Sequence, residues 1–177
     1  MPYDMNKIFK INGGWGWLGE RTIARWYTMY ATITQSREWL PDEVGGVVWL
    51  AFDNVATSIY VPLYCSITDV PESYKAPGRP KGFNRESAWW AFNRLGTLAA
   101  QRWGDMRYDV TDVWKPMQTE LFVNQKSTEQ KALELLKNDP MQAKKHLTGY
   151  GIFWGNKVVE KAWEIGDLLW TKYDEKF

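Results

Sequence analysis

Three apolar stretches in the first half of the chain have the pattern and composition of β-strands. Residues 21–37 are rich in Thr, Ile, Tyr and Trp, which favour extended backbone. Residues 45–52 form an almost unbroken apolar run, typical of a strand that is covered on both faces. Residues 57–67 form the third stretch, in which Pro62 indicates an edge strand or a bulge. Because no helical segment separates the three, we predict antiparallel neighbours in one sheet.

The second half of the chain has the pattern of helices. It follows a Pro/Gly loop over residues 75–84, and Asn84 is a favourable N-cap for the first helix. Pro116 is expected to kink or end the second helix, and Gly149 and Gly151 to interrupt the pattern near the end. The predicted helices cover residues 85–103, 105–123, 128–137, about 140–147 and 154–173.

Two capping boxes set the starts of the middle helices. Ser127 and Gln130 have the spacing of an N-cap and its reciprocal partner. Asp139, Pro140 and Gln142 combine an N-cap, a proline at the first helical position and a partner at the third. Both patterns predict a new helix that begins at that point.

Strands followed by helices predict an α+β fold in one unit over residues 1–177. Its parts are an entry loop (1–20), strands (21–74), the loop 75–84 and helices (85–177). The helices can cover one face of the sheet, whereas an all-apolar strand needs two covered faces. We therefore expect an oligomer, or a larger fold whose other part is a separate polypeptide.

Composition excludes several classes of protein. Of 177 residues, 45% are hydrophobic and 24% charged, and the net charge is +1, so nothing indicates nucleic-acid binding. No apolar run is long enough to span a membrane. The single cysteine, Cys65, and the single histidine, His146, argue against an internal disulfide, a Cys- or His-based metal site and a Ser-His triad. We expect neither a metal nor an organic cofactor.

Twelve tryptophans are the unusual number in the composition, and aromatic residues reach 16%. Aromatic side chains bury large areas, so this content excludes disorder. We expect four of the tryptophans to need a second covering layer: Trp15, Trp17, Trp49 and one of the pair Trp89 and Trp90. A sugar-binding platform is a weaker alternative, because most tryptophans fall inside apolar strands and helices.

Several blocks of the sequence resemble, in order and spacing, the C69 family of dipeptidases, which are N-terminal-nucleophile hydrolases. They are PYDM (2–5), ERTIA (20–24), TQSR (34–37), LPDEVGGVVWLAFDN (40–54), ATSIYVPLYCSITDVPESY (56–74) and ESAWWAFN (86–93). The resemblance implies an αββα sandwich and a catalytic cysteine whose own α-amino group acts as the base. It also implies that this chain corresponds only to the C-terminal part of a longer enzyme, with the nucleophile on a missing or separate N-terminal part.

The resemblance also supplies the candidate site residues. Related hydrolases place an active-site arginine on a comparable strand after a Gly-rich turn, which makes Arg21 the first catalytic candidate and Arg25 a second, substrate-binding one. An arginine can bind a carboxylate or stabilise an oxyanion, although an ion-paired surface arginine is the alternative. Trp15 and Trp17 in the loop GGWGWLGE are candidates for the wall of a substrate pocket, or for packing on a partner.

Cys65 and His146 are expected to be structural. Cys65 lies in the middle of the chain in a predicted strand, and an unpaired cysteine usually behaves as a small buried hydrophobe. His146 is expected on the surface or at a helix end. The functional prediction is a part or subunit of a C69-like cysteine dipeptidase that acts on dipeptides or small amides with its nucleophile-bearing partner chain, a homo-oligomer, or both. The alternative is a non-catalytic structural or binding subunit derived from the same fold.

Overall fold

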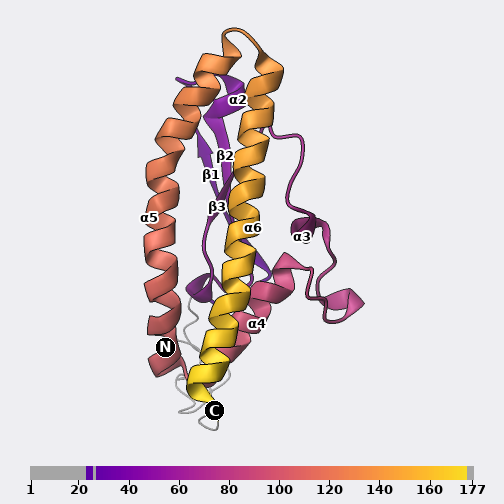
Figure 1. Ribbon diagram of the computed structural model, residues 1–177, viewed down its shortest axis with the longest axis vertical. Coiled ribbons are helices and arrows are strands. Elements are labelled where there is room, and N and C mark those ends of the chain that lie inside the picture. Colours follow the sequence, from indigo (N-terminus) through magenta and orange to yellow (C-terminus); the bar gives the residue numbers. More distant parts are fainter. Residues whose placement is uncertain (1–22, 26, 175–177) are drawn as a thin grey trace.

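A three-stranded antiparallel sheet in the order β1–β2–β3 begins the structure, a computed structural model that describes residues 23–25 and 27–174. Its strands are β1 (Tyr30–Ser36), β2 (Gly46–Phe52) and β3 (Val61–Tyr64). Short helices lie in the connections, and three long helices follow the sheet (Figure 1). The helices are α2 (Asp42–Gly45), η1 (Val55–Thr57), α3 (Glu72–Lys75), η2 (Arg79–Lys81), α4 (Ala88–Gln101), α5 (Trp103–Leu136) and α6 (Pro140–Tyr173). The predicted α+β order is confirmed.

The strands are shorter than the sequence pattern indicates. β1 begins at Tyr30, and the third strand has only four residues, because Thr57 ends η1 and residues 58–60 form a loop before Val61. The prediction that Pro62 marks an edge is confirmed, since β3 is the last strand of the sheet. The first long helix begins at Ala88 with Ser87 as its N-cap, so the prediction of Asn84 as the cap is wrong. The Asn84 side chain instead accepts a hydrogen bond from the Glu86 N–H.

Helix α5 is continuous, which contradicts the prediction of two helices divided near Pro116 and Ser127. Pro116 is exposed, while Trp114 and Met117 are buried in the core. Packing of this buried face outweighs the one backbone hydrogen bond that a proline removes. Ser127 does not cap a helix, because its hydroxyl donates to the Asn124 carbonyl within the same helix.

Helix α6 is also continuous and passes through the glycines that were expected to interrupt it. The Asp139 cap is confirmed, since its carboxylate accepts hydrogen bonds from the Met141 and Gln142 N–H groups. Gly151 has a packing role: a Cβ there would lie 3.2 Å from the Leu63 side chain. The glycine therefore lets the helix approach β3 closely, and tertiary contact outweighs its low helix propensity.

Helices α5 and α6 cover one face of the sheet (Figure 1). Val47, Trp49 and Ala51 alternate along β2 and are buried, and the Trp49 ring packs on Phe122 of α5 with ring centroids 5.2 Å apart. Trp89 is also buried, at 7% exposed. The expectation that Trp49 needs a second layer is therefore wrong, because it lies on the helix-covered face. Thr32 and Thr34 on the opposite face are exposed.

Candidate functional site

Arg25 lies just before β1 in a tight turn, where the Thr28 N–H donates to the Arg25 carbonyl. Its side chain is half-buried, donates to the Tyr27 hydroxyl and lies over the Tyr27 ring. The prediction of a strand at this position is wrong, since the turn replaces it. Among residues 23–25 and 27–174, the guanidinium contacts this phenol, and a guanidinium can bind an anionic ligand.

The turn that holds Arg25 lies at the end of the sheet where β2 finishes. The Asp53 N–H donates to the Met29 carbonyl over 2.9 Å and so joins the start of β1 to the residue after β2. Asp53 has a positive φ of 57°, in the left-handed region that Asp and Asn tolerate better than most residues. The chain leaves the strand sharply there, which carries Asn54 and η1 towards α4.

Asp53 belongs to a polar cluster in which Asp53, Asn54 and Thr57 are buried and Asn93 is half-buried. The Asn93 side chain donates to the Asp53 carboxyl over 2.9 Å, and the Asn54 side chain accepts from the Ala56 N–H. Burial raises the pKa of Asp53, while hydrogen bonds from the Asn93 side chain and the Asn54 backbone and the charge of Arg79 act in the opposite direction. A carboxyl group with a raised pKa can hold a proton nearer to neutral pH than an exposed one.

A second buried polar group lies at the opposite end of the sheet. Arg37 Nη1 lies 2.8 Å from the carboxylate of Glu129 in α5, and the two side chains are 9% and 13% exposed. Tyr64 and Gln125 also donate to Glu129, over 3.0 and 2.9 Å. Burial raises the pKa of Tyr64, so the phenol donates as a neutral group. These contacts assign Arg37 a structural role that joins β1 to α5.

Cys65 lies directly after β3, where its N–H donates to the Gly46 carbonyl at the start of β2. It is exposed, so the prediction of a buried strand cysteine is wrong. The whole of β2, about 20 Å for seven extended residues, separates this position from the Arg25 turn. Cys65 therefore cannot act on a substrate that is bound at Arg25.

The other predicted site residues lie outside the described part of the chain. Arg21, Trp15 and Trp17 all precede residue 23, so the structure does not place them. Their roles stay predictions. Of the four candidates, Arg25 is the one that lies in the described part of the chain, and its turn lies at the end of the sheet that contains Asp53.

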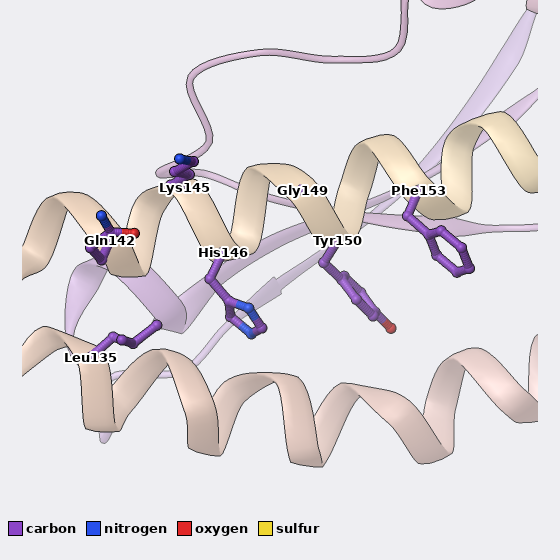
Figure 2. A pocket seen from close by; sticks show the side chains of 7 residues that line it. All are labelled: Leu135, Gln142, Lys145, His146, Gly149, Tyr150 and Phe153. Carbon is purple, nitrogen blue, oxygen red and sulfur yellow. The ribbon is translucent and has the colours of Figure 1, made fainter.

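A surface pocket of about 540 Å³ lies between α5 and α6, near the turn that joins them. Figure 2 shows that His146, Tyr150 and Phe153 extend from α6 into the space beside α5. The His146 ring is held in place by a hydrogen bond, with Nε2 3.2 Å from the Thr128 carbonyl oxygen. Burial raises the pKa of Tyr150 to about 12, so it stays protonated. His146 is half-buried and lies in the second turn of α6, which continues to Tyr173, so the expected helix end near this residue is wrong, while its place beside a surface pocket agrees with the expected surface position.

Metal ligands do not gather in the described part of the chain. Among residues 23–25 and 27–174, no three His, Cys, Asp or Glu side chains come together in a way that could hold an ion. No helix in that part has the length and apolar character to cross a bilayer.

The residue that sequence reasoning missed is Asp53. It directly follows the most apolar strand of the chain. An acidic residue at the end of a buried strand is a signal that can be read from sequence. Its contact with Asn93 could not be read, because 40 residues separate the two.

Comparison with known proteins relates this chain to a family of peptidases and to proteins named as dipeptidases. The sequence description of one family, Peptidase family C69, matches residues 5–116. A "Probable dipeptidase B" of Streptococcus pyogenes serotype M1 is 25% identical over 115 residues, which cover 65% of this chain and 23% of the relative.

Two further relatives are similar. A "Probable dipeptidase B" of Lactococcus lactis subsp. lactis (strain IL1403) is 35% identical over 79 residues, covering 44% of this chain and 15% of the relative. A "Probable dipeptidase" of Latilactobacillus sakei is 26% identical over 116 residues, covering 63% of this chain and 24% of the relative. The chain thus spans less than a quarter of the length of the curated relatives that it matches.

Proposed function

Because this chain belongs to peptidase family C69, we propose that it is one part of a cysteine dipeptidase that hydrolyses dipeptides or small amides. The nucleophilic cysteine is held by another part of the enzyme, and this chain supplies binding and positive charge. The observation that carries the proposal is the family match over residues 5–116, together with relatives that are each named as dipeptidases.

The chemistry requires a nucleophile that this chain is not suited to supply. In the proposed reaction, a terminal cysteine thiolate attacks the peptide carbonyl, and its α-amino group receives the thiol proton and passes it to the leaving amine. Water then hydrolyses the thioester and regenerates the thiol. Cys65 is the single cysteine of the sequence and lies within the chain, so it has no free α-amino group.

We assign the arginines near the start of β1 to the charged groups of the substrate. The tetrahedral intermediate carries an oxyanion and a dipeptide carries a carboxylate, and a guanidinium stabilises either one. Arg21 is the first candidate and Arg25 the second. The half-buried position of Arg25 and its phenol partner support this assignment, and Trp15 and Trp17 are assigned to the wall of the pocket.

The test is purification of the tagged chain from its source organism, with identification of the polypeptide that accompanies it. Dipeptide hydrolysis is then measured with and without a thiol-alkylating reagent. We expect activity in the complex, loss of activity on alkylation, and full alkylation sensitivity in a Cys65→Ala complex. A Cys65→Ala complex that has lost all activity would contradict the assignment of the nucleophile.

The arginine roles are tested in the same complex. Arg21→Ala and Arg25→Ala should each lower kcat/KM at least about tenfold, or about 1.4 kcal/mol of transition-state stabilisation. Arg85→Ala is the matched control, because its side chain is 64% exposed and lies near α6. Unchanged activity in both variants would overturn the assignment. A stable complex without hydrolysis would support the alternative, a non-catalytic subunit of the same fold.

A further inference from the structure

The two edges of the sheet differ in their capacity to accept another strand. Hydrogen bonds join Met29 to Asp53 at one end of the β1–β2 pair and Arg37 to Gly45 at the other. Because hydrogen-bonded pairs alternate along an antiparallel ladder, the backbone N–H and C=O groups of the odd-numbered β1 residues point towards β2. The backbone groups of the even-numbered residues therefore point to the outer edge. They belong to Tyr30, Thr32, Thr34 and Ser36, and all four residues are exposed.

The opposite edge, formed by β3, is closed. There the Cys65 N–H bonds to the Gly46 carbonyl, so the backbone groups of the odd-numbered β3 residues point towards β2. The backbone groups of Pro62 and Tyr64 therefore point outwards. Pro62 has no N–H to offer, and the Tyr64 carbonyl already accepts from the Ile67 N–H. Helix α6 also lies against this strand at Gly151. Of the two edges of the described sheet, β1 is therefore the one to which a further strand can add.

The β1 edge lacks the features that normally prevent strand addition. Its sequence YATITQS contains no charged residue, no proline and no glycine, and β1 runs for seven residues without a bulge. Ile33 on the helix-facing side is 54% exposed, and Phe122 of α5, which packs on the cross-strand partner of Ile33, is 57% exposed. An added strand with apolar residues on one side would cover both.

We propose that a β-strand from the nucleophile-bearing part of the same enzyme pairs with the outer edge of β1. This inference rests on the proposed function and specifies where the two parts join. The C69 relatives are more than four times as long as the regions that match this chain, so most of their sequence has no counterpart here. Pairing beside β1 would also hold the partner close to the Arg25 turn, which leads directly into this strand.

The direction of each N–H group provides a sharp test. Thr32→Pro removes an outward N–H and places a proline ring on the edge, the arrangement that Pro62 already shows on β3. The isolated variant should keep its fold, measured by circular dichroism and thermal unfolding. Ile33→Pro removes an inward N–H and should destabilise the isolated chain clearly. Thr32→Val keeps both the N–H and the branched shape, so it is the matched control.

Association is measured in the complex isolated from the source organism, with a partner identified by peptide sequencing as a C69 polypeptide. We expect Thr32→Pro to weaken association at least about tenfold, while Thr32→Val leaves it unchanged. Hydrogen exchange should show that the amides of residues 30, 32, 34 and 36 exchange freely in the isolated chain and become protected in the complex.

Four outcomes decide the matter. A C69 partner that binds Thr32→Pro as tightly as wild type would overturn the edge proposal and leave the proposed function intact. A chain that forms dimers through these amides, lost in Thr32→Pro, would assign the edge to a second copy. Amides already protected in the isolated chain, and exposed after deletion of residues 1–22, would assign it to the chain's own segment. Absence of a C69 partner and of hydrolysis would overturn the proposed function itself.

Discussion

At the scale of the residue, Asp53 and Glu129 show how one kind of group behaves in two settings. Both carboxyl groups are largely withdrawn from water, but Glu129 faces the guanidinium of Arg37, whereas Asp53 is bonded to the neutral amide of Asn93. A buried carboxylate is stabilised mainly by an opposite charge, and burial without one raises its pKa. The two residues should therefore respond oppositely to the loss of their charge.

Asp53→Asn should remove a pH dependence from the stability of the protein. The raised pKa of Asp53 means that the folded chain binds more protons than the unfolded chain above the ordinary carboxyl value of 3.8. The stability contribution of this group is thus present at low pH and is lost as the pH rises through its raised pKa. Asparagine accepts the same hydrogen bond and also tolerates positive φ.

We expect the stability of the Asp53→Asn variant relative to wild type to increase between pH 4 and pH 8, measured by urea unfolding at each pH. Asp53→Ala is the control: it also lacks the carboxyl and should show the same pH trend, but without the hydrogen bond it should be about 1–3 kcal/mol less stable than the Asn variant at every pH. An Asn variant whose difference from wild type is constant with pH would contradict this account.

Glu129→Gln should destabilise the protein by about 2–4 kcal/mol, since it leaves the Arg37 charge buried without its partner. The matched control is Glu134→Gln on the same helix, whose pair with Lys131 is exposed and should contribute less than about 0.5 kcal/mol. Chemical denaturation of both variants gives the comparison. Equal effects would show that Arg37 finds a new partner, such as solvent.

At the scale of the element, glycines decide where α6 can approach the rest of the molecule. Gly155 faces the loop before α3, and a Cβ there would lie 2.4 Å from Pro71 Cγ and 3.1 Å from the Tyr74 hydroxyl. Tyr74 is fixed by its burial between this helix and the Phe52 ring, and burial raises its pKa. Gly149, on the same helix, faces open space.

Gly155→Ala and Gly149→Ala should consequently change the stability of the protein in opposite directions. The first should destabilise the protein by about 1–3 kcal/mol, because a packed loop would have to shift. The second should stabilise it by about 0.5–1 kcal/mol through higher helix propensity alone. Thermal unfolding of the two variants is the measurement. Stabilisation by both would mean that the Pro71 loop moves away at little cost.

The same two long helices show where the sequence pattern was insufficient. Pro116, Ser127, Gly149 and Gly151 are local signals for a helix end, and the structure continues through each of them. Such signals amount to about 1–3 kcal/mol each, which is less than the burial of a long apolar face contributes. Asp139 with Pro140 succeeded as a signal because a tight turn and a real start of a helix coincide there.

At the scale of the whole molecule, the sheet has one edge that can still pair with another strand. In the described part of the chain, one face is covered by α5 and α6, one edge is closed by Pro62, and the four β1 residues whose backbone groups point outwards are exposed. A sheet of three strands with an open, uncharged edge is a ready site for strand pairing. This agrees with a chain that spans less than a quarter of its relatives.

Binding of the remaining part of the enzyme should therefore stabilise the chain. A partner that binds only the folded state adds about 2.7 kcal/mol at a concentration of 100 times Kd. We expect the melting temperature of the chain to rise with the concentration of its C69 partner, measured by near-UV circular dichroism. An unrelated protein of similar size should cause no shift. A melting temperature that does not depend on the partner would contradict assembly.

The sequence by itself determined the class of the fold, the antiparallel order of three strands, the edge position of Pro62, the start of α6 and the membership of the family. These follow from local composition, from turn and cap chemistry and from motifs, all of which act between residues close in the chain. The candidate site was predicted only as far as Arg25 and its neighbours, and the structure places Arg25 alone among them.

Only the tertiary structure decided which residues meet across the chain. It joined Asp53 to Asn93 and Arg37 to Glu129, buried Trp49 on the helix-covered face, exposed Cys65 at the far end from Arg25, and merged four predicted helices into two. The physical reason is that burial and hydrogen bonding between distant segments outweigh the weaker local preferences along a sequence. The register of the sheet was decided in the same way, and it determines which backbone N–H groups of β1 point outwards.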